Sequence, residues 1–249
     1  GHEKPDVPLR FGPNIKDWPE MPPLTDDLLL KVVSYITDPV TTTDELIPSG
    51  EISSYRSNPL RIAEFTLSKR DPAYVGRAKE VRAFETAREQ NKAVGDLPEL
   101  RGLYKQIRSI PGMEGADPSK IGIGSAVFAN KPGDGSAREQ AASCQKVLGG
   151  WANFAREYAT KRYRSNLINW GVVPFLVKDE PVFENGGYVF IPGLRQAILS
   201  GKKEIEAYAL GERVLRFSVS VGELTNEEKA ILASGCLIHY NREKNRSKA

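Results

Sequence analysis

The second half of the chain alternates short apolar stretches with stretches of helical periodicity, and this alternation limits the folds open to it. Short apolar runs bounded by turn residues are typical of strands, and strands that alternate with helices predict an α/β architecture. The predicted strands are residues 121–129, 172–177, 188–191, 204–210 and 214–221, and the predicted helices are residues 138–148, 154–168 and 226–234. Because strands outnumber helices here, we expect a layered sheet with helices on one side.

The first half of the chain begins with a proline-rich segment. Six of the first 23 residues are proline, which removes amide donors and favours extended chain, so residues 1–24 are predicted to form a linker or strap. Thr25 is a candidate N-cap for a helix over residues 26–36, whose apolar positions suit one buried face. Further helices are predicted from residue 59 to 67, over 74–90 and around 97–107.

Composition excludes several classes of protein. The chain has 249 residues, 40% of them hydrophobic, which is enough for a substantial core. It has no run of 18 apolar residues and no signal-peptide h-region, so we expect a cytoplasmic protein, with the mitochondrial matrix as the alternative. The 35 basic and 32 acidic residues give a net charge of +3, which does not predict a nucleic-acid partner. The basic residues within 242–249 are predicted to form a solvated tail.

The two cysteines, Cys144 and Cys236, lie far apart in the sequence and have no C-x-x-C spacing. Two remote thiols are too few for an iron–sulfur cluster, which needs several thiolate ligands. We therefore expect this chain to bind no metal by itself.

The run 129–142 joins a predicted strand to a predicted helix through two glycines. Gly133 and Gly135 let the backbone approach a bound group closely, and the amides that begin the helix favour an anion. Ser136 and Glu139 match the S-x-x-E capping box, so one interpretation is that Ser136 only caps the helix. The other is that the same donors stabilise the Ser136 hydroxyl as an alkoxide base, beside a carboxylate-binding guanidinium at Arg138.

The sequence GDGSAREQAA at 133–142 is similar to the glycine-serine-arginine-glutamate motif of aconitases and isopropylmalate dehydratase small subunits. The similarity continues in family order with FAR at 154–156, residues 166–169, GVVPFLV at 171–177 and ILASGCLIHY at 231–240. Upstream, TDELIP at 43–48 resembles the family's Thr-Asp segment, and Arg56 stands where aconitases place a second substrate arginine. Several motifs in order are harder to obtain by chance than one.

The resemblance implies a swivelling domain of the aconitase small-subunit type, layered β/β/α, over residues 25–249, with residues 60–118 as a helical insertion. It implies a hydro-lyase that acts on a hydroxy di- or tricarboxylic acid with a 4Fe-4S cluster ligated outside this chain. The isolated chain would then be inactive, and its partner would be the cluster-bearing domains, in the same polypeptide or in a large subunit.

The resemblance also implies roles for individual residues. Ser136 would be the catalytic base, with Asp44 in the supporting hydrogen-bond shell. Arg56, Arg138, Gly135 and Ala137 would bind substrate. From the residues alone, Arg56 could equally be a surface arginine, and Asp44 could fix an Asx-turn.

Three positions depart from the family pattern. Glu45 and Gln140 stand where aconitases have histidines, and Ala137 replaces a second serine. Loss of that hydroxyl removes one hydrogen bond to substrate, which shifts the preference away from citrate-like ligands.

Two other functions stay open at this point. The chain could be a naturally separate small subunit of an isopropylmalate dehydratase-like enzyme; the proline-rich start favours a tether to a preceding body instead. It could also be a non-catalytic relative that binds RNA or protein, although no aromatic and basic residues interleave as in an RNA platform.

Overall fold

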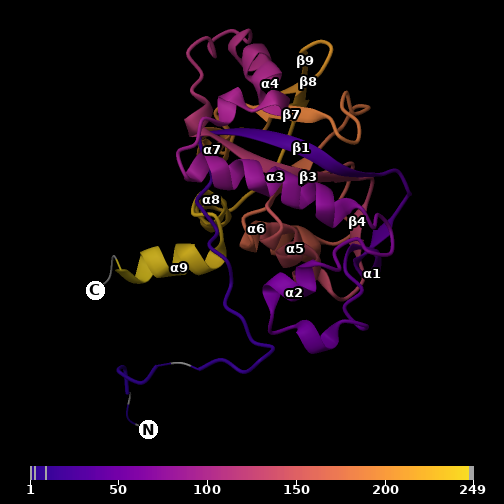
Figure 1. Ribbon diagram of the computed structural model, residues 1–249. Helices are drawn as coiled ribbons and strands as arrows, with labels where there is room; N and C mark the ends of the chain where they lie inside the picture. Colours follow the sequence, from indigo (N-terminus) through magenta and orange to yellow (C-terminus); the bar gives the residue numbers. More distant parts are fainter. Residues whose placement is uncertain (1, 3, 9, 247–249) are drawn as a thin grey trace.

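Seven strands form one curled sheet in the order β6-β5-β3-β1-β7-β8-β9 in the computed structural model, which describes residues 2, 4–8 and 10–246 (Figure 1). The neighbours β6, β5, β3 and β1 run parallel, and β7, β8 and β9 continue the sheet with antiparallel pairings. Leu176 and Ser220 exchange backbone hydrogen bonds of 2.7 and 3.1 Å, so the edge strand β6 meets the chain just beyond β9. The sheet therefore nearly closes on itself at that point.

The strands and helices have the following bounds. The strands are β1 (Asp27–Ile36), β2 (Thr41–Thr42), β3 (Ile121–Ala129), β4 (Pro132–Asp134), β5 (Gly150–Ala155), β6 (Val173–Leu176), β7 (Tyr188–Ile191), β8 (Ile205–Leu210) and β9 (Leu215–Val219). The helices are α1 (Thr43–Leu46), α2 (Pro59–Ala63), α3 (Tyr74–Glu89), α4 (Pro98–Arg108), α5 (Arg138–Val147), α6 (Lys161–Asn169), α7 (Leu194–Ser200), α8 (Asn226–Ala233) and α9 (Leu237–Arg246).

The helix predicted over residues 26–36 is wrong, because this segment forms the central strand β1. Leu28 and Leu30 are buried in the core on one face of the sheet, while Leu29 and Val33 are buried in the core on the other. An apolar stripe on one side of a helix could not fill both cores, whereas a strand sends successive side chains to opposite faces. Thr25 caps no helix and donates to the carbonyl of Asp27 at 2.6 Å.

Helices cover both faces of the sheet, which differs from the one-sided layering that the sequence predicted. Helix α3 packs on one face through Ala78 and Val81, and α7 packs on the other through Leu194 and Ile198 (Figure 1). All nine residues of β3 are buried, as expected of a central parallel strand covered on both sides. The coarse prediction of a mixed α/β fold is confirmed.

Two more predictions near the C-terminus need correction. The predicted helix 154–168 is a strand end followed by a helix, because the fully buried β5 pairs with both β3 and β6 and α6 starts only after the Thr160 cap. The motif at 231–240, which resembles a closing helix and strand of the aconitase family, lies instead in the two helices α8 and α9 and the turn between them. Residues 242–246 of the predicted basic tail belong to the last turns of α9, and residues 247–249 lie outside the described residues.

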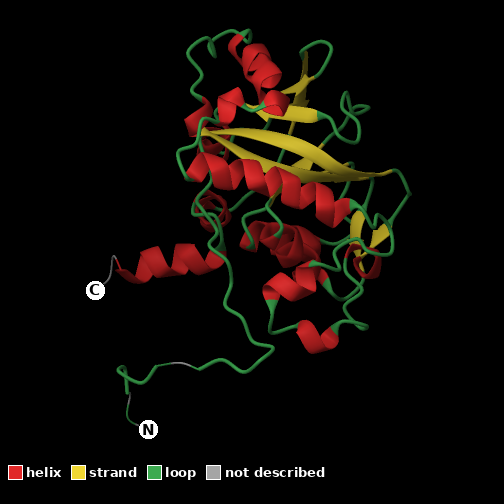
Figure 2. Cartoon of the chain, viewed as in Figure 1, coloured by secondary structure: helices red, strands yellow, loops and turns green. Residues whose placement is uncertain are grey.

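The proline-rich segment is extended along the surface of the molecule. The described part of residues 1–24 holds neither helix nor strand and runs from the molecule's edge past α8 to β1 (Figure 2), with residues 1, 3 and 9 outside the description. Trp18 contacts Trp170 with ring centroids 4.3 Å apart, which anchors this segment to the end of α6.

The predicted helices of the 60–118 stretch are present as α3 and α4. No described helix is long and apolar enough to cross a membrane.

Candidate active site

A small parallel pairing joins two motifs that are about ninety residues apart in sequence. Strand β2 precedes the TDEL helix α1, strand β4 precedes the Gly135-Ser136 loop, and Thr42 pairs with Asp134. Glu45 stabilises α1 through a capping box with Thr42: its carboxylate accepts from the Thr42 amide at 2.7 Å. Glu45 therefore stabilises the start of this helix.

Gly135 lies so close to α1 that only glycine suits the position. Its φ is +128°, and a Cβ added there would meet Oγ1 of the buried Thr43 at 2.2 Å. Gly133 has a φ of +97° and faces the ring of the buried Tyr163 in the same way. At both glycines the backbone comes close to another group, as predicted. In this structure that group is a side chain of the same chain, Thr43 or Tyr163.

Ser136 is not the N-cap of the following helix. The N-cap of α5 is Ala137, and no side chain caps this helix, so the capping box predicted from Ser136 and Glu139 does not form. Ser136 is exposed and stands one residue before that cap. Its hydroxyl is therefore presented at the positive end of α5 without a capping role.

The loop before α5 and the loop after α1 together line an open hollow of about 300 Å³. Three of the predicted site residues, Arg56, Ser136 and Ala137, lie in it, although Arg56 is 80 residues upstream of Ser136. The rest of the lining is Ser49, Glu139 and Gln140. The sequence analysis did not predict Ser49 as a site residue. Its position between the TDELIP segment and Arg56, two candidate parts of the site, could have indicated it.

Arg138 begins α5 two residues after Ser136, but it does not line the hollow. Its side chain is half-buried, and its Nε atom is buried with no hydrogen-bond partner among the described residues. A buried donor without a partner costs free energy, so this guanidinium is suited to an external acceptor.

Asp44 does not join the hollow either. Its carboxylate accepts from Nζ of Lys69 at 3.0 Å, and Lys69 also pairs with Glu51 at 2.7 Å. The hydrogen bond to Glu51, and to a smaller extent the one to Asp44, raises the pKa of the Lys69 ammonium. Lys69 thereby ties α1 to the loop that leads to Arg56, and within the described residues the Asp44 carboxylate accepts no hydrogen bond from Ser136 or from the backbone amides of an Asx-turn.

The donor set of this chain does not fit an iron–sulfur cluster. Cys144 and Cys236 are both free and buried, and burial raises the pKa of the Cys144 thiol to about 12. A protonated thiol is a poor ligand, because metals bind the thiolate. The described residues contain no group of three or more His, Cys, Asp and Glu side chains that could hold a metal ion.

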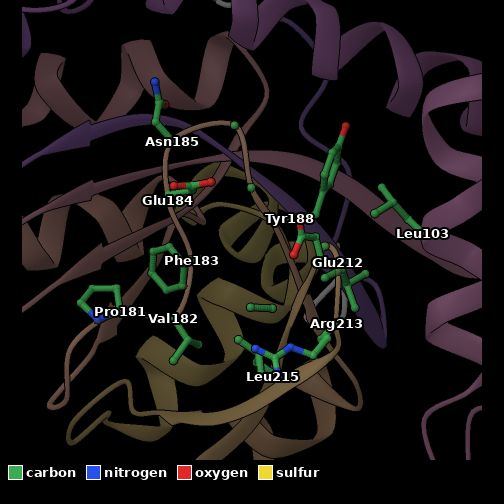
Figure 3. Close-up of a pocket in the computed structure, with 15 residues that line it drawn as sticks. Leu103, Pro181, Val182, Phe183, Glu184, Asn185, Tyr188, Glu212, Arg213 and Leu215 are labelled. Carbon is green, nitrogen blue, oxygen red and sulfur yellow. The ribbon is translucent and has the colours of Figure 1, made fainter.

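A wider hollow of about 760 Å³ lies at another place, between the loop before β7 and the hairpin that joins β8 to β9. Figure 3 shows Glu184 and Asn185 on the first loop, Glu212 and Arg213 on the hairpin, and Tyr188 at the start of β7. None of the sequence motifs contributes to it. We therefore place the candidate site at the smaller hollow, where the motifs meet.

Comparison with known proteins supports the architecture. No protein-family model matches the sequence, and no curated protein sequence is significantly similar to it. Among solved structures, the fold is similar to that of 3-isopropylmalate dehydratase (LeuD) from Methanocaldococcus jannaschii, with a TM-score of 0.52 and 18% identity. The similarity covers 89% of this chain and 97% of that one. The chain thus has the fold of an isopropylmalate dehydratase protein, as the resemblance of its motifs predicted.

Proposed function

We propose that this chain is the substrate-binding swivel domain of an aconitase-family hydro-lyase that acts on a hydroxy di- or tricarboxylic acid. The observation that carries the proposal is the hollow in which Arg56 and Ser136 meet. Family motifs far apart in sequence converge there, on a fold similar to that of an isopropylmalate dehydratase. The assignment of residues 25–249 to one swivel domain, with residues 60–118 as a helical insertion, is part of the same proposal.

In the proposed reaction, the Ser136 Oγ removes the proton next to a substrate carboxylate. The start of α5 places partial positive charge beside this oxygen, which favours its ionised form. Arg56 binds one carboxylate across the hollow, and Arg138 offers its unpaired Nε to another. A serine alkoxide is stable only in a dry, cationic site, and Ser136 is exposed here, so a partner surface has to close over the hollow.

That partner surface would also supply the 4Fe-4S cluster, since the thiols of this chain do not fit one. Asp44 would act at a distance, by holding α1 and the Arg56 loop together through Lys69. The half-buried methyl group of Ala137 gives the hollow an apolar wall where a serine would donate a hydrogen bond. This favours a substrate with an apolar substituent over citrate.

A separate small subunit is the second form of the proposal. The observation in its favour is that the similarity covers 97% of the LeuD chain, so this chain contains a counterpart of almost all of it. An immunoblot of the native protein distinguishes the two forms. A band near 27.5 kDa supports a separate subunit, and a much larger band supports a tethered domain.

The test of the site is steady-state kinetics of the enzyme reconstituted with its cluster-bearing part. We expect Ser136→Ala to abolish kcat with little change in KM, because a base acts mainly in the transition state. Arg138→Lys should damage both constants, because lysine lacks the guanidinium fork. Ser136→Ala should change the free energy of unfolding by less than about 0.5 kcal/mol, since Ser136 caps no helix.

Ser218→Ala is the matched control, because Ser218 is an exposed serine on the remote strand β9. Near-normal turnover in Ser136→Ala, equal to that of the control, would end the assignment of Ser136 as the base.

A further inference from the structure

A separate cavity, of about 250 Å³, lies where four distant segments meet. Helix α3, the turn after α5, the start of β5 and the proline-rich segment all contribute to it. Pro19, Glu20, Met21 and Pro22 form one wall, and the carbonyl of Pro22 is held tightly against Gly235, where an added Cβ would meet it at 2.3 Å. This cavity shares no lining residue with the hollow around Ser136.

Lys146 lies in this cavity with an almost completely buried side chain. The residue is 6% exposed, and its Nζ stands 3.8 Å from the ring centroid of Trp151. Its hydrogen bond goes to the carbonyl of Gly171 at 3.3 Å, a long and uncharged contact for an ammonium group. A buried lysine is ordinarily paired with a carboxylate, so this side chain is held in the cavity by weaker partners.

The surroundings keep the amine partly neutral near physiological pH. Burial lowers the pKa of Lys146 to about 8, and the opposing effects of Cys236 and Glu85 are smaller. Glu85 is already engaged by Arg88, which donates to both of its carboxylate oxygens, and by the amide of Ile123. The other charged residues that line the cavity are Glu20 on the proline-rich segment and Arg82, Glu85 and Glu89 on α3. Cys236, before α9, also acts electrostatically on the amine.

We propose that Lys146 is a covalent binding site for a small, uncharged aldehyde, which it holds as an imine inside this cavity. The amine nitrogen attacks the carbonyl carbon and forms a C–N bond. One amine proton moves to the former carbonyl oxygen, and the carbinolamine then loses this hydroxyl group and the second amine proton as one molecule of water. A C=N bond replaces the C–O bond, so the step needs no oxidant or reductant.

The lining favours an aldehyde over other electrophiles. A protonated imine keeps a positive charge on the face of Trp151, where a cation is stabilised. Acylation of Lys146 would give a neutral amide and so remove that charge. Reaction with carbon dioxide would give a carbamate, which is an anion. Three of the five charged residues that line the cavity are acidic, which disfavours an anionic adduct or ligand.

The experiment is reductive trapping of the intact chain with propanal and cyanoborohydride at pH 7.5, followed by peptide mass mapping. An amine with a pKa of about 8 has about 200-fold more neutral form at this pH than an ordinary lysine with a pKa near 10.4. We expect Lys146 to be labelled at least tenfold faster than the exposed Lys202, which is read from the same digest.

Two controls make the result decisive. In urea the preference for Lys146 should disappear, because its environment is lost, and in folded Lys146→Met the fast label should be absent. Label at exposed lysines with Lys146 unmodified would overturn the proposal and leave Lys146 the structural role of holding Trp151. An equal ratio of Lys146 to Lys202 labelling in the folded chain and in urea would overturn the proposal as well. Both of these outcomes are measured on the wild-type protein.

Discussion

Replacing Gly135 by alanine should destabilise the protein for two separable reasons. The φ of +128° lies in a region that L-residues avoid, which costs about 1–3 kcal/mol. The new Cβ would also stand 2.2 Å from Oγ1 of Thr43, and forcing atoms into a packed site costs about another 1–3 kcal/mol. Thr43 is buried and β-branched, so its side chain cannot rotate away freely.

Gly186→Ala is the matched control for this change. Gly186 also has a positive φ, +84°, but a Cβ added there meets nothing within 4 Å. This variant therefore carries only the backbone strain, of about 1–2 kcal/mol. The difference between the two variants contains the contact between the Ser136 loop and α1 together with the extra backbone strain at φ +128°, and a cycle with Thr43→Ala separates these two contributions.

Urea denaturation monitored by circular dichroism gives the free energy of unfolding of each variant. We expect Gly135→Ala to lose about 1–3 kcal/mol more than Gly186→Ala. Adding Thr43→Ala to Gly135→Ala should recover part of that excess, with Thr43→Ala alone completing the double-mutant cycle. If Gly135→Ala costs no more than Gly186→Ala, the close approach of the two motif segments is not the reason for glycine at this position.

Two further predictions concern metal binding and pH. Reconstitution of the isolated chain with iron and sulfide should leave it colourless, because Cys144 and Cys236 are buried and too few; a brown species with stoichiometric iron would contradict this. Partial burial opposes ionisation of Glu99, but hydrogen bonds from Lys31 and Tyr188, each 2.5 Å long, outweigh it and lower the pKa of its carboxyl group. These two hydrogen bonds therefore stabilise the folded protein at a pH above the ordinary pKa of glutamate. Their contribution is lost as the pH falls through the lowered pKa of Glu99. Unfolding free energies measured from pH 3 to pH 7 should fall less steeply toward acid in Glu99→Gln, and identical slopes would refute the role of this carboxylate.

The sequence alone located most of the secondary-structure elements, among them the central strand β3 at its predicted bounds of 121–129. Strands β6 to β9 and helices α3, α4, α5 and α8 lie within a few residues of their predicted bounds, because turn residues bracket them and their apolar periodicity is clear. The order of the motifs also indicated the family of folds, which the similarity to a solved isopropylmalate dehydratase supports. These are local signals, carried by residues close together in the chain.

Long-range packing decided what the sequence could not. The apolar residues of β1 fit one helical face and two buried sheet faces equally well, so the sequence predicts a helix where the structure has the central strand. Ser136 carries the pattern of a helix cap, yet the chain enters α5 through Ala137, after a glycine whose φ of +128° suits its contact with Thr43. The meeting of Arg56 with Ser136 depends on the pairing of β2 with β4, a contact between distant segments that only the folded chain brings about.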